Sequence, residues 1–393
     1  MSLTRRRLFQ RLSSHDSAVH AEWISARGRE AGLTEYGEQG MAAGARPIRI
    51  ASNENPLGPG QHVLDAIVGK FPEAARYPFN ATQTEGALIS ALAQKFSAKN
   101  ENVLLGPGSG EILTHSVRAF TSASKPLVTA WPSFENPRDT AKKLGTPVRE
   151  VALDGKLRID IAKLVEASKG AGLVFFCNPN NPTATVHGKT AVADMVKAIR
   201  SASPDTMILI DEAYHDYVTD PSYQSAIDIA LATPNVFVTR TFSKAYGMAG
   251  LRAGYAIGHA PTIKSIAAYK MPYGLGTLVL GGAIVGLGNQ GHIDGEQKRN
   301  TAVKAFTVKA FADMGISGTD SQTNFLFMDI KRPAAGFRDA CRAAGVLVGR
   351  DFPPYEKTHA RISIGTMEEM QKAVEVFKKV LGSTTTTSSK DRR

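Results

Sequence analysis

Cysteine is scarce in this sequence, with only Cys177 and Cys341 in 393 residues. Two thiols so far apart make neither a disulfide framework nor a cysteine metal site, which favours a reducing compartment. The nine histidines are scattered along the chain, so no metal is expected. No apolar run is long enough to span a bilayer, and a membrane partner is not expected either.

Nucleotide and nucleic-acid motifs are also missing. No strand-like run leads into Gly-x-Gly-x-x-Gly with an acid downstream, which argues against a dinucleotide-dependent dehydrogenase. The net charge of +11 comes partly from the two ends of the chain, and no basic stripe is interleaved with aromatics. We therefore interpret the charge as attraction for anionic substrates and expect no nucleic-acid partner.

The first residues resemble part of an export signal. Arg6-Arg7-Leu8-Phe9 is similar to a twin-arginine motif, which needs an apolar stretch directly after it. Charged residues interrupt the segment 10–40, so that stretch is absent. We expect a cytoplasmic protein and keep export as the alternative.

The composition, with 42% hydrophobic and 21% charged residues, is ordinary for a globular protein, and the length predicts two domains. Short apolar runs alternate with helical patterns, which is typical of a buried, mainly parallel sheet with helices on both faces. Strands of this α/β sheet are predicted at 127–130, 173–176, 207–210, 236–238 and 254–257. Helices are predicted at 88–96 and within 299–313 and 366–381.

A second group of short strands, at 325–328 and 346–348, predicts a smaller α/β domain near the C-terminus. Its boundary with the large domain is expected near 285–300. Residues 1–44 are polar and broken by glycine, which indicates a lead-in segment. Residues 383–393 begin with a Ser/Thr-rich stretch and are predicted to be a disordered tail.

One lysine stands out. Lys244 follows the strand-like run 236–238, with Thr241 and Ser243 just before it and Arg252 eight residues after it. An amine can bond an aldehyde, while hydroxyls and a guanidinium can hold a phosphate. The pattern therefore predicts an aldehyde cofactor that carries a phosphate and supplies most of the chemistry.

Polar clusters follow several of the predicted strands, and ligands of open α/β sheets bind beyond the carboxyl ends of the strands. The turn Gly106-Pro107-Gly108-Ser109-Gly110-Glu111 leads into a predicted helix at 112–120. It is a candidate anion site or a plain helix entry. Phe134, in Trp131-Pro132-Ser133-Phe134, either stacks on a planar ring or packs in the core.

Three further clusters carry candidate residues. Cys177-Asn178-Pro179-Asn180-Asn181-Pro182-Thr183 has two Asn-Pro pairs, and its amides can donate to a ring oxygen or simply form a turn. In Asp211-Glu212-Ala213-Tyr214, a buried Asp211 would pair with a protonated pyridine nitrogen; the alternatives are a metal-binding acid and a plain strand end. Arg361 would clamp a substrate carboxylate or lie on the surface.

In this order, the motifs resemble those of the fold-type I pyridoxal-phosphate aminotransferases, in particular the histidinol-phosphate aminotransferase group. Ser52-Asn53-Glu54-Asn55-Pro56-Leu57-Gly58-Pro59 is similar to that group's opening motif, and Arg76-Tyr77-Pro78 to its Arg-Tyr-Pro segment. The resemblance implies an aspartate-aminotransferase-like fold. A mainly parallel seven-stranded sheet would lie in a large domain, 76–290, beside a small α/β domain formed by 45–75 and 291–382.

The resemblance also implies a role for each matching residue. Lys244 would bond the aldehyde of pyridoxal 5′-phosphate and move a proton, and Asp211 would hold the pyridine nitrogen. The other implied roles are contact with the ring oxygen by Tyr214 and Asn181; stacking by Phe134; phosphate binding by Ser109, Gly110, Thr241, Ser243 and Arg252; phosphate contact across a subunit interface by Tyr77; and substrate binding by Arg361, Asn324, Asn55 and Arg350. Because Tyr77 would reach the partner's cofactor, a homodimer with shared active sites is implied.

The implied activity is transfer of an amino group between an L-amino acid, or an amino-acid-derived phosphate such as histidinol phosphate, and a 2-oxo acid. Decarboxylation or oxidation of an amino acid with the same cofactor is the alternative. A non-catalytic binding protein is a further one, against which the intact Lys244 and Asp211 argue. Two departures concern the substrate end. Ala184 replaces the glycine of Asn-Pro-Thr-Gly, where alanine fits if φ stays negative, and Gly349 is inserted before Arg350.

Overall fold

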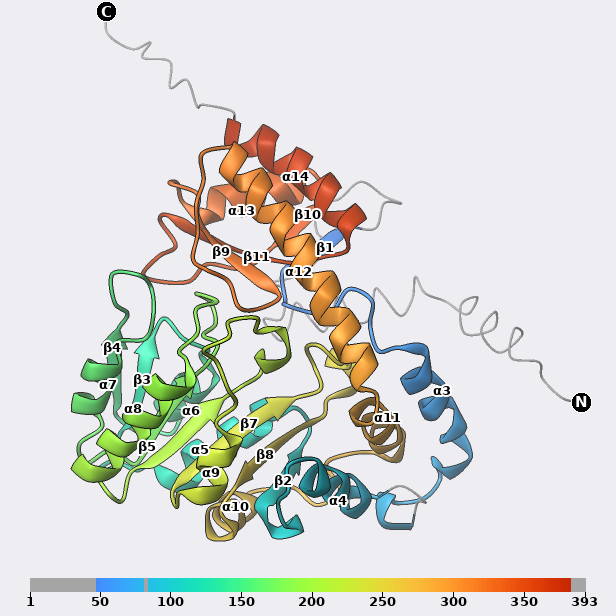
Figure 1. Ribbon diagram of the computed structural model, residues 1–393, viewed down its shortest axis with the longest axis vertical. Coiled ribbons are helices and arrows are strands. Elements are labelled where there is room, and N and C mark those ends of the chain that lie inside the picture. The colour runs from blue at the N-terminus through green and yellow to red at the C-terminus, as the bar shows by residue number, and fades with distance from the viewer. Residues whose placement is uncertain (1–46, 81–83, 383–393) are drawn as a thin grey trace, which may run out of the picture.

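The computed structural model describes residues 47–80 and 84–382, which form a larger and a smaller body stacked on one another (Figure 1). The predicted lead-in at 1–44, with its twin-arginine-like start, and the predicted tail at 383–393 lie outside the described residues.

The larger body is built on a seven-stranded sheet with the order β2-β8-β7-β6-β5-β3-β4. Only β8 runs antiparallel to its neighbours, β2 and β7, and the other pairs are parallel. The strands are β2 (Val103–Gly106), β3 (Leu127–Trp131), β4 (Val148–Ala152), β5 (Leu173–Cys177), β6 (Met207–Asp211), β7 (Val236–Thr241) and β8 (Gly254–Gly258). The predicted mainly parallel sheet is therefore confirmed, and each strand predicted for it is present.

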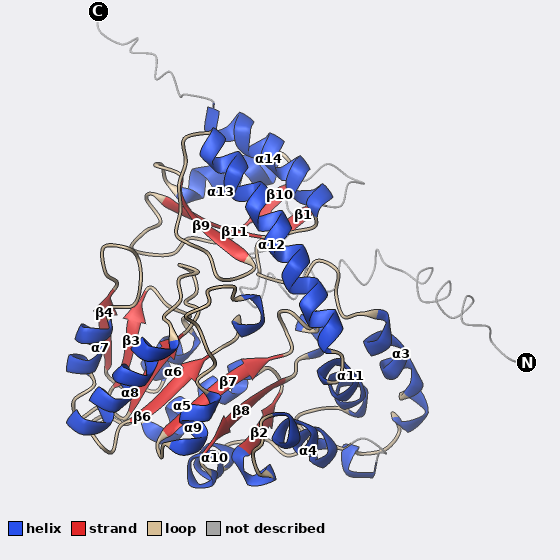
Figure 2. Ribbon diagram, viewed as in Figure 1, coloured by secondary structure: helices blue, strands red, loops and turns tan. Residues whose placement is uncertain are grey.

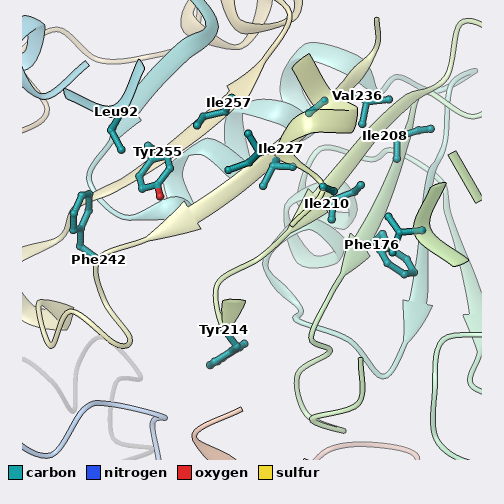
Figure 3. Packing of buried hydrophobic residues seen from close by; sticks show 14 of the residues in the cluster. Leu92, Phe176, Ile208, Ile210, Tyr214, Ile227, Val236, Phe242, Tyr255 and Ile257 are labelled. Carbon is teal, nitrogen blue, oxygen red and sulfur yellow. The ribbon is translucent and has the colours of Figure 1, made fainter. Parts of the chain in front are cut away.

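Successive side chains of the central strands pack on opposite faces of this sheet, as the strand period of two requires. In β5, Leu173, Phe175 and Cys177 pack with α5 (Ser109–Phe120), α6 (Asn136–Lys143) and α10 (Ala260–Ala267). Val174 and Phe176 face the other way, toward α7 (Ile161–Ala167), α8 (Lys189–Ala202) and α9 (Ile227–Ala232). Figure 3 shows part of this second layer, with Phe176, Ile208 and Ile210 on neighbouring strands.

Three more helices cover the β2 edge of the sheet (Figure 2): α3 (Gln61–Gly69), α4 (Glu85–Lys95) and α11 (Thr277–Leu287). Val63 of α3 and Leu280 of α11 share the core of the larger body. Short 3-10 helices lie at Phe71–Glu73, Pro78–Asn80, Asn100–Asn102, His215–Tyr217 and Ala249–Leu251. Within residues 47–80 and 84–382, no helix is both long and apolar enough to cross a membrane.

The smaller body contains segments from both ends of the described chain. Its strand β1 (Ile48–Ile50) pairs in parallel with β10 (Val346–Val348), and β9 (Phe325–Asp329) pairs antiparallel with β11 (His359–Ser363). The helices α12 (Gln290–Asp313), α13 (Ala334–Ala343) and α14 (Met367–Gly382) pack on these strands around a core of their own. The domain limits given above for 45–75, 76–290 and 291–382 stay predictions.

Candidate active site

A cavity of about 260 Å³ lies between the two bodies, at the carboxyl ends of the parallel strands. This is where ligands of open α/β sheets bind. Most of the residues predicted from the separate motifs meet there: Ser109, Gly110, Phe134, Asn181, Asp211, Tyr214, Thr241, Ser243, Lys244, Arg252, Arg350 and Arg361. The parallel strands end at this edge, so the polar residues that follow them line one cavity.

Lys244 follows the end of β7, and its amine is partly buried in the cavity. The Nζ atom donates a hydrogen bond to the carbonyl oxygen of Ser52 at 3.2 Å and lies 5.5 Å from the ring centre of Tyr214. Burial, together with the positive charge of Arg361, lowers the pKa of Lys244 to about 8. Roughly a tenth of the amine is therefore neutral at pH 7, which an ordinary lysine does not approach. A neutral amine is the nucleophile that aldehydes require.

Asp211 is the last residue of β6 and is buried. Thr239 donates to its Oδ1 at 2.8 Å, and the Cys177 thiol lies 3.9 Å from its Oδ2. The guanidinium of Arg240 pairs with the neighbouring Glu212, at 2.9 Å. Burial raises the pKa of Asp211 to about 6. A buried carboxylate of this kind suits a ligand that brings its own positive charge.

Tyr214 lies just beyond the end of β6 (Figure 3), where its hydroxyl accepts a hydrogen bond from the Asn53 amide at 3.1 Å. Burial raises the pKa of the Tyr214 phenol, which therefore stays protonated at neutral pH. Asn53 has a φ of 56°, in the left-handed region that asparagine tolerates better than most residues. Its side-chain oxygen accepts from the hydroxyl of Ser363 at 2.7 Å. These two hydrogen bonds tie the opening segment to the residues after β6 and to the end of β11.

Arg361 on β11 points into the same cavity and is buried. Its guanidinium donates to Asn181 Oδ1 at 2.8 Å and to the carbonyl oxygen of Ala51 at 2.7 Å. Both acceptors are neutral, so the positive charge is not cancelled by a carboxylate at these contacts. A fixed guanidinium of this kind is a suitable receptor for a substrate carboxylate.

An anion cradle forms where α5 begins. Gly108 precedes the helix with a φ of +79°, and a Cβ added there would lie 2.2 Å from the Arg252 guanidinium. A Cβ on Gly254 would lie 2.3 Å from the backbone nitrogen of Ser109. The two glycines thus let β8, Arg252 and the helix start approach closely. Arg252 also donates to Ser243 Oγ at 3.1 Å. Helix N–H groups, hydroxyls and a guanidinium together suit a phosphate.

Three predicted site residues do not line the cavity of this chain. Asn55 and Asn324 are buried beside it and hold backbone: Asn55 donates to Ala245 O and Asn324 to Asn53 O, each at 3.0 Å. They position the segments that carry Lys244 and Asn53. Tyr77 lies elsewhere and is 65% exposed, with its ring 5.8 Å from that of Phe79.

Several cavity residues were not among the predicted site residues: Ser52, Asn53, Glu135, Cys177 and Ala213. Four of them stand inside motifs that were recognised, and Glu135 directly follows Phe134, so membership of a motif or proximity to one is the signal that would have found them. The condition under which alanine fits at position 184, a negative φ, is not met, because the φ of Ala184 is 61°. Ala184 thus lies in the left-handed region, where its N–H donates to Asn180 O at 2.7 Å.

Residues 45–377 match the family model described as aminotransferase class I and II. The chain belongs to this family. A histidinol-phosphate aminotransferase of Moorella thermoacetica is 31% identical over 337 residues, which cover 85% of each chain. The crystal structure of histidinol-phosphate aminotransferase from Sinorhizobium meliloti, in complex with pyridoxal 5′-phosphate, is 26% identical with a TM-score of 0.79. That match covers 85% of this aminotransferase and 90% of that chain.

The fold is also that of aspartate aminotransferase. A Thermus thermophilus aspartate aminotransferase variant, 19% identical, aligns with a TM-score of 0.75 over 87% of this chain and 99% of its own. The predicted fold class and the predicted amino-transferring activity are thereby confirmed. The predicted cofactor, pyridoxal 5′-phosphate, is confirmed as well. The cavity fits this molecule, since it offers an amine for the aldehyde, a buried carboxylate for the ring nitrogen and a cradle for the phosphate.

Proposed function

We propose that this aminotransferase moves an amino group between an L-amino acid and a 2-oxo acid, with Lys244 as the residue that both bonds the cofactor and moves the proton. When bound, pyridoxal 5′-phosphate supplies an aldehyde that bonds amines and a ring that accepts the electron pair from the substrate Cα. The observation that carries the proposal is the lowered pKa of Lys244 in the cavity that also holds Asp211 and Arg361.

The roles of the other residues follow from their contacts. Asp211 would keep the ring nitrogen protonated, because a buried carboxylate is stabilised by an adjacent positive charge. Tyr214 and Asn181 would bond the ring oxygen, and Phe134 would stack on the ring. Since the Asn181 oxygen accepts from Arg361, its amide N–H groups remain as the donors for this task. Ser109, Gly110, Thr241, Ser243 and Arg252 would hold the phosphate, and Arg361 the substrate carboxylate.

A half-reaction screen tests the activity. The purified, cofactor-loaded protein is mixed with one L-amino acid or with histidinol phosphate, without a 2-oxo acid. A transaminase is expected to consume its visible absorbance band stoichiometrically and to release the matching 2-oxo compound; addition of a 2-oxo acid should then restore the band. Release of carbon dioxide with no loss of the band would instead identify a decarboxylase on this scaffold.

The pKa of Lys244 predicts the pH dependence of cofactor capture. Because only the neutral amine attacks an aldehyde, the rate at which cofactor-free protein bonds the vitamer should rise about tenfold per pH unit below pH 8. It should level off above pH 8, since burial has lowered the pKa from 10.5 to about 8. Stopped-flow absorbance between pH 6.5 and 9.5 measures this rate. A rate still rising steeply at pH 9.5 would mean that the lysine is not perturbed.

A homodimer is the second part of the proposal, supported by exposed aromatic side chains. Tyr77, Phe79 and Tyr273 are 65%, 56% and 55% exposed, and their ring centres lie 5.4 to 5.8 Å apart. Met271, 69% exposed, is close to Tyr273 in sequence. A cluster of large exposed apolar groups is typical of a protein interface. A second copy of the chain would cover this aromatic cluster and receive Tyr77 at its cofactor phosphate.

Replacing both Tyr77 and Phe79 with serine should convert the dimer into monomers and weaken cofactor binding at least about tenfold, since a shared site loses its partner's contact. Sedimentation velocity and cofactor titration measure the two effects. Leu144→Ser removes an apolar side chain that is 48% exposed and lies outside the cluster, and it should change neither. A wild-type protein that sediments as a monomer at micromolar concentration would contradict the dimer.

A further inference from the structure

One charged pair in the cavity joins the larger body to the smaller body. Glu135 follows Phe134 and directly precedes α6 in the larger body, while Arg350 follows β10 in the smaller body. Both side chains line the cavity, and the Arg350 guanidinium donates a hydrogen bond to a Glu135 carboxylate oxygen. The side chains are 22% and 31% exposed, so water screens their charges less than on an open surface.

The inserted Gly349 explains why Arg350 reaches this position. The Gly349 N–H donates to the carbonyl oxygen of Arg361 at 3.0 Å, and a Cβ on Gly349 would lie 2.6 Å from that oxygen. Only glycine allows this close approach of the two backbones. Arg350, the next residue, consequently lines the same cavity as Arg361.

A single buried ring separates the two arginines. The guanidinium carbon of Arg350 lies 4.4 Å from the centre of the Phe352 ring, and that of Arg361 lies 4.6 Å from the same centre. Both contacts are within the range of cation–π attraction, so the ring holds each guanidinium in place. Without the Glu135 carboxylate, the cavity would therefore present two fixed guanidinium groups to its substrate. Each could bind one end of a doubly anionic molecule.

Arg350 and Arg361 each donate hydrogen bonds within the cavity. The Arg361 guanidinium donates to the neutral oxygens of Asn181 and Ala51. Arg350, in contrast, contacts the carboxylate of Glu135. The positive charge of Arg350 is thus paired inside the cavity with the carboxylate of Glu135.

We propose that Glu135 determines substrate specificity by acting as a built-in carboxylate that occupies Arg350. This inference rests on the proposed aminotransferase function. An amino acid whose side chain carries a phosphate or a second carboxylate must displace Glu135 from Arg350 and then lie beside the displaced negative charge. Such a repulsive element lowers affinity for one substrate class and leaves the other class unaffected. Amino acids with neutral side chains, which leave the pair intact, are the favoured donors.

Equilibrium binding of two unreactive acids to the cofactor-loaded protein tests the inference. Glutarate has a second carboxylate that can reach Arg350, while butyrate has only the carboxylate that Arg361 would bind. In Glu135→Gln, the dissociation constant of glutarate should fall about tenfold, and that of butyrate should change less than about threefold. The matched control is Glu150→Gln, which also loses an ion pair with an arginine, Arg138, but lies outside the cavity. It should leave both constants unchanged.

The same binding measurements on two further variants show whether the gain depends on Arg350 and guard against a folding defect. In the double variant Glu135→Gln/Arg350→Gln the gain for glutarate should vanish, because the freed cation is gone. Glu135→Asp keeps the charge with a shorter reach and serves if Glu135→Gln fails to fold; it should show a smaller gain. An unchanged ratio of the two dissociation constants in well-folded Glu135→Gln and Glu135→Asp would overturn the role of Glu135.

Turnover separates this inference from the function on which it rests. In Glu135→Gln, kcat/KM for L-glutamate relative to L-methionine should rise about tenfold, in parallel with the binding ratio. Absence of transamination with every donor tried would refute the proposed function, whereas the glutarate-to-butyrate ratio would still decide whether Glu135 competes for Arg350.

Discussion

Replacement of Lys244 by alanine is expected to lower kcat/KM by about 10⁴-fold or more, because one side chain would lose both its bond to the cofactor and its proton transfer at the substrate Cα. Steady-state kinetics with the donor found in the half-reaction screen measure the loss. The variant should still bind the vitamer through the phosphate cradle, which does not include the amine. Its absorbance should then be that of the free aldehyde.

Two controls define what the Lys244→Ala result means. Lys244→Arg keeps a positive charge that does not become neutral near pH 8, so it should be as inactive as the alanine variant. Lys309→Ala removes an exposed lysine paired with Asp313 on α12 and should retain full activity. If Lys244→Arg kept more than about a hundredth of the wild-type rate, the lysine would act as a charge and not as the proton carrier.

Burial of the charged Lys244 amine lowers the unfolding free energy of the cofactor-free protein. Its pKa of about 8 lies below the ordinary 10.5, so the native state disfavours the charged amine. The corresponding penalty of about 3 kcal/mol is fully present below pH 8 and disappears as the pH rises from 8 to 10.5. Cofactor-free Lys244→Ala should therefore be no less stable than the wild type at pH 7, which urea denaturation checks.

Asp211→Asn should reduce kcat by about 10²- to 10⁴-fold, since asparagine cannot keep the ring nitrogen protonated by opposite charge. The substitution preserves the shape of the side chain and an oxygen that can accept from Thr239. The loss should appear mainly in kcat, because the phosphate cradle and Arg361, which hold the cofactor and substrate, are unaltered. Kinetics at saturating cofactor separate this effect from weaker cofactor binding.

The same substitution should stabilise the cofactor-free protein. Burial raises the pKa of Asp211 from 3.8 to about 6, so the charged carboxylate costs the fold about 3 kcal/mol. The sign follows from the raised pKa: the cost is absent below pH 3.8, grows as the pH rises and is complete above pH 6. Asp211→Asn should thus gain up to about 3 kcal/mol of unfolding free energy at pH 7.5 and almost nothing near pH 4.

Asp211→Asn should thus lower kcat but raise the unfolding free energy. This combination distinguishes a carboxylate that serves catalysis from one that serves the fold. Asp313→Asn, at an exposed ion pair on α12, should change the unfolding free energy by less than about 1 kcal/mol and leave kcat unchanged. A cofactor-free Asp211→Asn protein that is clearly less stable than the wild type at pH 7.5 would argue that Asp211 serves the fold. The proposed pairing with the ring nitrogen would then lose its physical basis.

Much of the larger body could be predicted from the sequence because its central strands are buried on both faces. Runs such as Leu173–Cys177 and Met207–Asp211 are apolar throughout and end in polar residues, which locates both the sheet and its ligand-binding edge. The edge strand β4 was missed since exposed Arg149 and Glu150 interrupt its apolar pattern. An edge strand has fewer neighbours to cover it, so it does not need two apolar faces.

The part of the site that lies between the bodies could not be read from local patterns. Asn53 meets Tyr214 and Ser363, from which it is separated by 161 and 310 positions. The contact between Glu135 and Arg350 spans 215 positions. Such contacts depend on how the small body sits on the large one, which no local spacing encodes. The positive φ of Ala184 could not be predicted from local sequence either, because its surroundings impose a conformation that alanine does not prefer.

Reduction of the cofactor-loaded protein with borohydride, followed by proteolysis and mass spectrometry, tests the central claim most directly. Borohydride makes the bond between an amine and the cofactor aldehyde permanent, so the modified residue can be located in a peptide. The account predicts a single modified peptide in which Lys244 carries the cofactor, and no modification in Lys244→Ala. Stoichiometric labelling of another lysine, or none in protein saturated with the vitamer, would contradict it.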